Sequence, residues 1–220
     1  MNANQLSEQL LLAAKTGQDY FRSMARLELL LPSQLQTDLA DDAHKLAFWI
    51  NIYNAQFLIL KKELGLRKPR IFTKKEIKIA GMPFSLDDIE HGILRRSRIK
   101  WSFGYLPNPF STYKLRRLMI ARTDPRIHFA LNCGAKSCPP IGVYSSEKIE
   151  QQLALATASF LEQETSICNQ KREIRTTSLL CWYLGDFGGV LGIRRLLSEV
   201  LDVDQPTFRL IFNEYDWSES

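Results

Sequence analysis

The sequence predicts an α+β fold that is rich in helix and has a small, mostly antiparallel sheet. Apolar residues recur at helical spacing over several long stretches, whereas segments of alternating polarity are short and scattered. The 220 residues are 45% hydrophobic and 24% charged, which is typical of a globular domain that buries a core without disulfide or metal. No internal repeat is present. Helices packed on a small sheet are the architecture that these observations favour.

Two long helices are expected in the first part of the chain. Residues 5–31 place leucines and aromatic residues at helical spacing, and Pro32 would close this helix. Residues 42–64 begin with acidic residues and are apolar on nearly every side, which is typical of a buried helix. We therefore expect residues 1–39 to form a helical segment that packs on a domain of residues 40–217.

Shorter elements are expected to follow. Residues 76–86 alternate around a Gly-Met-Pro turn and predict a hairpin, and residues 87–96 predict a short helix. Residues 98–113 read as a loop, and the apolar run 126–133 reads as a buried strand. The remaining expected elements are a helix that starts at Ser145 or Ser146, a strand at 172–176, helices at 179–183 and 190–200, and a strand at 207–212.

The charge and the hydropathy pattern restrict the partners and the location. The net charge is +5 and the pI is about 9.0, a mild excess that does not favour nucleic-acid binding. The N-terminus lacks the basic and apolar regions of a targeting segment, and the longest apolar stretch, residues 46–60, is too short to span a membrane. We expect a cytoplasmic protein that has no membrane partner.

The loop after the apolar run holds the first candidate for chemistry, Cys138. Lys136 and the backbone N–H groups of this loop would favour a thiolate, and the same N–H groups would hold an oxyanion. Pro139 pushes Cys138 toward an extended conformation. Cys133 ends the apolar run, so that packing and chemistry are both open for it.

The other two cysteines, Cys168 and Cys181, are expected to serve packing. In a reducing compartment all four thiols would be free. A disulfide between Cys133 and Cys138 is sterically feasible, but the cytoplasm disfavours it.

A thiol nucleophile needs a histidine base and a group that orients the histidine. His91 follows Glu90, but adjacent residues of an α-helix point about 100° apart. This pair therefore works only if the helix is distorted or if a partner comes from elsewhere. His128 begins the apolar run and is either a core histidine or the base, and His44 is expected at a helix start.

Two further hypotheses concern a metal site and the asparagine side chains of the buried helix. His128, Cys133 and Cys138 could bind zinc with His91 as the fourth ligand, but the C-x4-C spacing departs from the usual C-x2-C. We expect no metal and no cofactor.

Asn51 and Asn54 lie on the buried helix and must find partners. They are expected to brace a neighbouring loop or to steady the site.

Three long motifs stand out in the sequence: residues 48–55 (FWINIYNA), 85–95 (SLDDIEHGILR) and 124–140 (DPRIHFALNCGAKSCPP). Shorter motifs lie at 182–183, 186–187 and 215–217. Together these motifs resemble the domain-of-unknown-function 547 family, and the resemblance covers about residues 40–217.

The resemblance implies a fold similar to the papain-like and transglutaminase group in permuted order. It also implies a constellation made of Glu90, His91 and either Cys138 or Cys133. The expected activity is that of a thiol-dependent hydrolase or acyl transferase acting on a peptide, amide or ester. The alternative is a non-catalytic binding or scaffold module with the same fold, or a Cys/His metal site.

Overall fold

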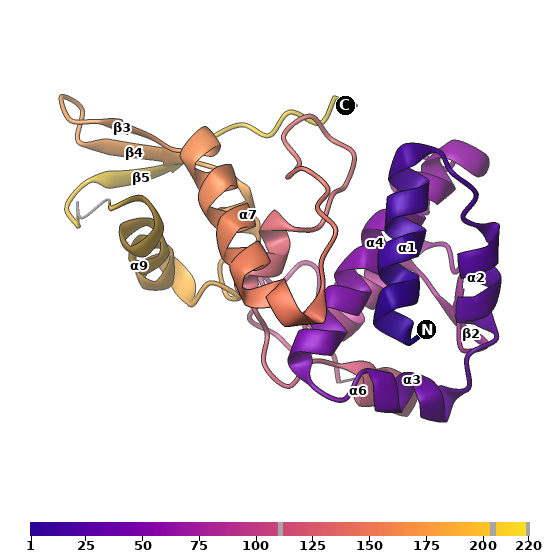
Figure 1. The fold of residues 1–220 in the computed structure, drawn as a ribbon. Helices are drawn as coiled ribbons and strands as arrows, with labels where there is room; N and C mark the ends of the chain where they lie inside the picture. The colour runs from indigo at the N-terminus through magenta and orange to yellow at the C-terminus, as the bar shows by residue number, and fades with distance from the viewer. Residues whose placement is uncertain (110–111, 203–205, 219–220) are drawn as a thin grey trace.

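The computed structural model describes residues 1–109, 112–202 and 206–218. Helices form most of this part of the chain, as expected (Figure 1). The α-helices are α1 (Ala3–Thr16), α2 (Phe21–Glu28), α3 (Pro32–Asp38), α4 (Asp42–Glu63), α5 (Arg70–Thr73), α6 (Tyr113–Leu118), α7 (Ile149–Glu164), α8 (Leu179–Trp182) and α9 (Gly189–Leu201). Three segments have other helical geometry: a π-helix, η1 (Asp88–Leu94), and two 3-10 helices, η2 (Pro125–Phe129) and η3 (Ser146–Lys148).

Two small sheets complete the α+β fold. The predicted hairpin is present as β1 (Ile77–Ile79) and β2 (Met82–Phe84), which pair in antiparallel fashion. The second sheet has the order β3-β4-β5 and is mixed, because β3 and β4 are antiparallel whereas β4 and β5 are parallel. Its strands are β3 (Ser166–Cys168), β4 (Glu173–Thr176) and β5 (Arg209–Phe212).

The expected N-terminal helix over residues 5–31 is two helices, so that this prediction is wrong in its detail. Gly17 adopts φ +70° and ends α1, and α2 begins after a short turn. Pro32 does not close a helix but begins α3. Its missing N–H is no loss there, because the first N–H groups of a helix have no partner within the helix.

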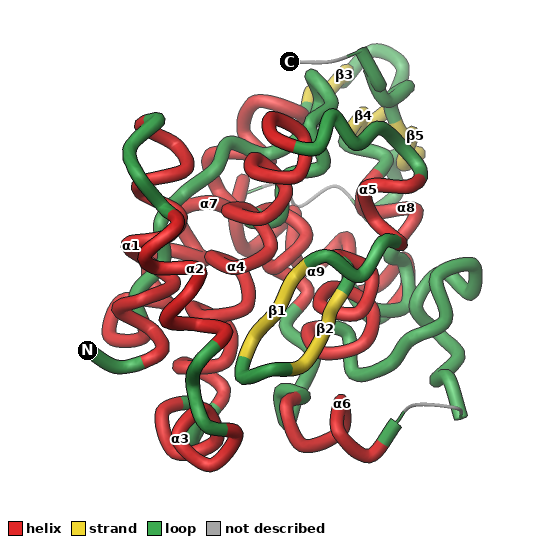
Figure 2. The backbone as a smooth tube through the Cα atoms, turned by 90° about the vertical axis from the view of Figure 1, so that its right-hand side faces the viewer, coloured by secondary structure: helices red, strands yellow, loops and turns green. Residues whose placement is uncertain are grey.

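Helix α4 is buried on nearly all sides, as its apolar pattern predicts. It packs against α1, and the two helices share one hydrophobic core to which Leu10, Trp49 and Ile52 belong. Figure 2 shows α1, α2 and α4 beside the β1–β2 hairpin. None of the described helices is long and apolar enough to cross a membrane.

A second hydrophobic core lies among α7, α8, α9 and strand β4. Phe160, Leu180 and Ile193 belong to it, and Phe129 of η2 packs in it. In Figure 1, α9 and the three-stranded sheet lie at one end of the molecule, α1 and α4 lie at the other, and α7 lies between them. The π-helix η1, which carries Glu90 and His91, packs in the first core, and η2, which carries His128, contributes Ile127 to the first core and Phe129 to the second.

Residues 126–133 are not a strand, so that this prediction is wrong. The Asp124 carboxylate accepts from the Arg126 N–H at 3.0 Å and starts the 3-10 helix η2. After η2, the side chain of Asn54 donates to the Ala130 carbonyl and accepts from the Asn132 N–H, both at 2.9 Å. The amide of Asn54 thus supplies the partners that a neighbouring strand would otherwise supply. A short apolar run alone does not distinguish these cases.

Substituting Gly134 tests how closely the cysteine loop packs on α4. Gly134 has φ +74°, and an added Cβ would lie 2.5 Å from Cζ of Phe57. Gly17 has φ +70° with nothing within 4 Å of such a Cβ, which makes it a matched control. We expect Gly17→Ala to lower the free energy of unfolding by about 1–2 kcal/mol through backbone strain, and Gly134→Ala by about 1–3 kcal/mol more through overpacking. Urea denaturation measures both, and equal losses would contradict the packing.

Candidate functional site

The first element of the site is the π-helix η1, which carries Glu90 and His91. Its start is fixed by Ser85 and Asp88, because the backbone N–H of each donates to the side chain of the other at 2.9 and 3.0 Å. A π-helix changes the angle between successive residues, and such turns are frequent at functional sites. Glu90 and His91 both line one cavity although they are adjacent. The helix is therefore distorted at this point, which is one of the two alternatives that the sequence left open for the pair.

A cavity of about 460 Å³ brings the predicted site residues together. All five candidates, which come from three separate segments, line it: Glu90, His91, His128, Cys133 and Cys138. Aromatic side chains supply much of the remaining wall: Tyr53, Phe72, Trp101, Trp182, Tyr183, Tyr215 and Trp217.

Cys133 and Cys138 are joined by a disulfide, which differs from the expected free thiols. The loop between them reverses at Gly134, and their Cα atoms lie 6.1 Å apart, within the range that a disulfide spans. Cys168 and Cys181 are free and half-buried. The two cysteines at the cavity are thus the ones that form a covalent pair.

The sulfur of Cys138 faces more hydrogen-bond donors than that of Cys133. The Cys133 N–H donates to Cys138 Sγ at 3.0 Å, and the Tyr215 hydroxyl lies 3.1 Å from the same atom. The distance from Tyr215 to Cys133 Sγ is 3.5 Å. These donors would stabilise a thiolate on Cys138 more than one on Cys133.

Several of the N–H groups that were expected to hold an oxyanion already have acceptors within the protein. The N–H groups of Gly134, Lys136 and Ser137 each donate to an acceptor of the protein. Lys136 and Ser137 bond to carbonyls of the C-terminal segment, at Ser218 and Asp216. The amides of Lys136 and Ser137 therefore fix the loop to the C-terminal segment.

His91 has its Nδ1 atom occupied. The Arg95 Nη1 group, which can only donate, lies 2.8 Å from it, so that Nδ1 accepts and the neutral ring carries its proton on Nε2. Nε2 lies 3.7 Å from the Asp87 carboxylate. Burial is the main cause that lowers the pKa of His91, and Arg95 adds to it, although Glu90 opposes this. His91 is therefore neutral near pH 7 and holds no free lone pair in this arrangement.

His128 has the opposite arrangement. Its Nε2 donates to the Asp186 carboxylate at 2.9 Å, and the same carboxylate oxygen accepts from Arg95 Nε at 2.5 Å. The ring stacks on Tyr183 with the ring centres 3.6 Å apart. Burial lowers the pKa of His128 although Asp186 opposes this. In the described part of the chain, Nδ1 of His128 has no hydrogen-bond partner, so that a neutral His128 keeps a lone pair there.

Glu90 is a buried carboxylate held by two phenols. Its oxygens accept from the hydroxyl groups of Tyr183 at 2.8 Å and Tyr53 at 3.3 Å. Burial by itself would raise the pKa of Glu90, but the opposing causes outweigh it: His91 and His128 lower the pKa when they are protonated, and the Tyr183 hydroxyl and Arg95 lower it whatever the charge of the histidines. Glu90 is therefore ionised near pH 7.

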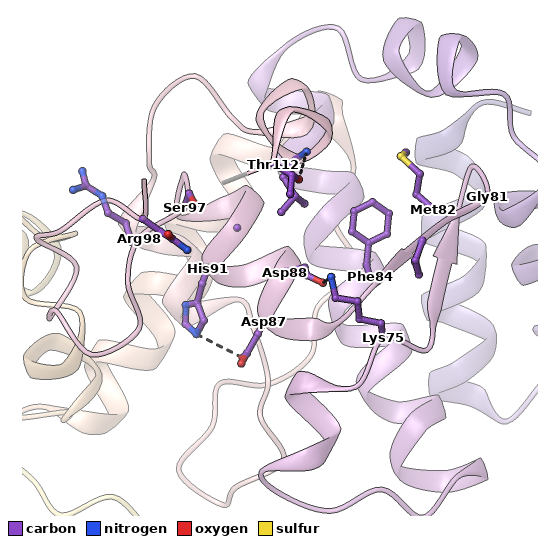
Figure 3. A pocket seen from close by; sticks show the side chains of 14 residues that line it. Lys75, Gly81, Met82, Phe84, Asp87, Asp88, His91, Ser97, Arg98 and Thr112 are labelled. Carbon is purple, nitrogen blue, oxygen red and sulfur yellow. Dashed lines mark hydrogen bonds and ion pairs between the residues drawn. The ribbon is translucent and has the colours of Figure 1, made fainter. Parts of the chain in front are cut away.

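A second cavity, of about 450 Å³, lies on the other side of η1 (Figure 3). It shares Asp87 and His91 with the first cavity. In Figure 3 the His91 ring points toward Asp87, and Phe84 and Lys75 lie on the hairpin side of the same space. His91 thus stands between two cavities.

Several residues that hold the site have no clear sequence signal. Asp186 and Tyr183 lie more than fifty residues after His128 and enter the sequence analysis only as part of short motifs. Tyr215 belongs to another such motif, and Arg95 enters the sequence analysis only as the last residue of the motif 85–95, with no role assigned to it. Only the packing of the C-terminal half against η1 makes these residues part of one cluster.

The two asparagines of α4 brace neighbouring loops. Asn51 exchanges two hydrogen bonds with the backbone of Tyr144, at 2.7 and 2.9 Å. Asn54 holds the segment before the disulfide, and Asn132 then donates to the Pro139 carbonyl at 2.6 Å. This chain of contacts positions the cysteine loop from a buried helix.

Within the described residues, no group of three His, Cys, Asp or Glu side chains is arranged to hold a metal ion.

The fold and the site define an α+β protein in which a carboxylate, two histidines and a cysteine pair line one cavity. The model of the family described as "Protein of unknown function, DUF547" matches residues 37–161, which is more than half of the chain. The protein therefore belongs to this family. No curated protein and no solved structure matches the chain, so that the likeness to papain-like folds stays a prediction. Asp186, Tyr183 and Tyr215 lie outside the matched residues.

The stability of the protein should depend on pH through its two buried histidines. An unfolded histidine takes up a proton near pH 6.5, whereas burial lowers the pKa of His91 and His128 in the folded protein. Below pH 6.5 the unfolded chain therefore binds more protons. The free energy of unfolding should fall with decreasing pH, by up to about 1.4 kcal/mol per pH unit for each histidine.

Urea unfolding at several pH values between about 7 and about 5 measures this slope. His128→Gln should reduce this slope by the contribution of about one proton. His44→Gln, at the exposed start of α4, is the control and should keep the wild-type slope. An unchanged slope in His128→Gln would contradict the neutral, buried state of this ring.

Proposed function

We propose that this protein is a thiol-dependent hydrolase or acyl transferase in which Cys138, once reduced, attacks an amide or ester carbonyl. One observation carries the proposal: a single cavity is lined by the cysteine pair and by a histidine that is oriented by a buried carboxylate. Such a combination of thiol, imidazole and carboxylate is the usual machinery for acyl transfer by a cysteine.

Cys138 is preferred to Cys133 as the nucleophile. Two donors, the Cys133 N–H and the Tyr215 hydroxyl, lie 3.0 and 3.1 Å from its sulfur. Hydrogen-bond donors near a sulfur stabilise its thiolate, which is the reactive form. Cys133 would then inactivate the nucleophile by forming a disulfide with it.

His128 is the better base of the two histidines. Asp186 holds its Nε2, which leaves Nδ1 to take a proton, whereas Nδ1 of His91 already accepts from Arg95. This differs from the assignment that the family resemblance implies, in which Glu90 and His91 serve. Glu90 and His91 then shape the cavity wall and its charge, while the Asp186 carboxylate stabilises the imidazolium of His128.

The proposed reaction has two halves. His128 Nδ1 takes the proton of the Cys138 thiol, and the sulfur adds to the carbonyl carbon. The amine or alcohol then leaves with the proton from His128, and a thioester remains on Cys138. In the second half, His128 removes a proton from water or from an acceptor, which attacks the thioester and releases the acyl group and the thiol.

The disulfide sets a condition on this reaction. Both sulfurs are bound to each other, so that a two-electron reduction by a thiol must precede attack. A reducing compartment such as the cytoplasm would supply that reductant, and we propose it as the location of the active protein.

A second candidate function is a binding module without catalysis. The same disulfide favours it, because a permanent bridge between residues 133 and 138 would be architecture that fixes the cavity wall. The two candidates differ in whether a reduced Cys138 reacts with an acyl donor.

Serine variants of the two cysteines test the proposal directly. The reduced protein, incubated with an activated ester such as p-nitrophenyl acetate, should hydrolyse it through an acyl group on Cys138, and mass spectrometry should locate this group. Cys138→Ser should abolish the reaction with or without reductant. Cys133→Ser should be active without reductant, because no disulfide can form.

Equal activity of the two variants, or acyl groups found only on Cys168 and Cys181, would refute Cys138 as the nucleophile. Absence of any acylation in folded, reduced protein would favour the binding module. Circular dichroism shows whether each variant keeps its fold.

A second test separates the two histidines. In reduced protein near neutral pH, iodoacetamide should label Cys138 faster than Cys168 and Cys181, which serve as internal controls. His128→Gln should slow the labelling of Cys138 by about tenfold or more, since loss of the imidazole destabilises the thiolate. His91→Gln should have a smaller effect. The reverse order would assign the base to His91.

A further inference from the structure

The proposed thiol chemistry does not use the buried charge of Glu90, which lies in the same cavity. Its two oxygens accept from the phenols of Tyr183 and Tyr53, and no Lys or Arg side chain among the described residues forms a hydrogen bond or ion pair with it. The nearest cationic candidate is His91, whose Nδ1 lies 3.6 Å away but accepts from Arg95. A buried carboxylate that faces a cavity and is bonded only to neutral donors attracts a cation.

The other charges of the cavity wall cancel. Lys100 Nζ lies 3.1 and 3.2 Å from the two oxygens of Asp87, so that this pair is neutral as a unit. Behind the wall, Arg95 and Asp186 form a second pair at 2.5 Å. With both histidines neutral, Glu90 is the charged side chain of the described lining that has no cationic partner in a hydrogen bond or ion pair.

The remaining wall is suited to a cation with apolar substituents. The rings of Trp217 and Phe72 already have a cation of the protein over them, Lys68 Nζ at 4.8 Å and Lys100 Nζ at 5.6 Å. Among the described lining residues, Trp101, Trp182 and Tyr215 are rings that have no such cation over them. Trp101, which is 86% exposed, stands where the cavity opens to solvent. Faces of aromatic rings attract cations, and groups of such rings bind quaternary ammonium ions.

We propose that this cavity binds an organic ammonium ion, with the positive nitrogen toward the Glu90 carboxylate and its alkyl groups against the aromatic wall. The volume of about 460 Å³ leaves room for such a group together with an acyl chain. If the protein is the proposed hydrolase, its substrate would be an ester or amide that carries an ammonium group. That part of the inference rests on the proposed function. The binding of the cation itself requires no thiol.

Choline and its uncharged isostere 3,3-dimethylbutan-1-ol provide the test, because they match in shape and differ in charge. Wild-type protein with its disulfide intact is titrated with each compound, and tryptophan fluorescence and calorimetry record binding. We expect choline to bind at least about tenfold more tightly than the alcohol. Glu90→Gln, which keeps the size of the side chain and one of its two acceptor oxygens, should remove this preference.

Two further variants control the measurement. Glu162→Gln, on the exposed face of α7, changes the net charge equally and should leave the preference for choline unchanged. Trp101→Ala alters an exposed side chain that the fold does not need, and it should weaken the binding of choline severalfold. It keeps the proposal testable if Glu90→Gln does not fold.

Equal affinity for the two compounds, no binding of either, or a preference that survives Glu90→Gln would overturn the cation site. Binding of choline by a protein whose reduced form never acylates Cys138 would refute the hydrolase and leave the cation site standing. Acylation of Cys138 without selective binding of choline would refute the cation site and leave the hydrolase standing.

Discussion

The buried ion pair between Arg95 and Asp186 is the interaction on which the site depends. Both side chains are almost completely shielded from solvent, and each also holds a histidine: Arg95 donates to His91, and Asp186 accepts from His128. The guanidinium also lies over the ring of Tyr183, 4.6 Å from its centre. Removal of one charge from such a pair leaves the other uncompensated, at a cost of about 3–5 kcal/mol. One contact between the π-helix and the C-terminal half thus fixes the tautomers of both histidines.

The disulfide gives the cavity two chemical states. When the sulfurs are joined, the wall is a closed loop that is tied to the C-terminal segment by the amides of Lys136 and Ser137. When they are separate, Cys138 keeps the N–H of Cys133 and the hydroxyl of Tyr215 as donors for a thiolate. The same geometry that favours a reactive thiol therefore also favours its capture by a neighbour five residues away. In the proposed function, the oxidation state of these two sulfurs therefore separates a binding role from a catalytic role.

The cavity combines an ionised carboxylate at a buried position with aromatic rings toward solvent. Glu90 is held by neutral phenols, whereas the other acidic groups near it have cationic partners. This division leaves the charge of Glu90 available to whatever enters the cavity. Because the proposed base is His128 and not His91, the pair that is most evident in the sequence is assigned to recognition and wall structure.

The sequence by itself determined the helix-rich fold class, the buried helix α4, the β1–β2 hairpin and the five candidate residues that line one cavity. These follow from hydropathy periods, from turn residues and from motif resemblance, all of which are local. It also indicated that Glu90 and His91 could act as a pair only if the helix is distorted or if a partner comes from elsewhere. Only the tertiary structure decided that residues 126–133 are not a strand, because the partners of that backbone come from Asn54. The pairing of His128 with Asp186 and of Arg95 with His91 likewise depends on contacts between segments distant in sequence, which no local pattern records.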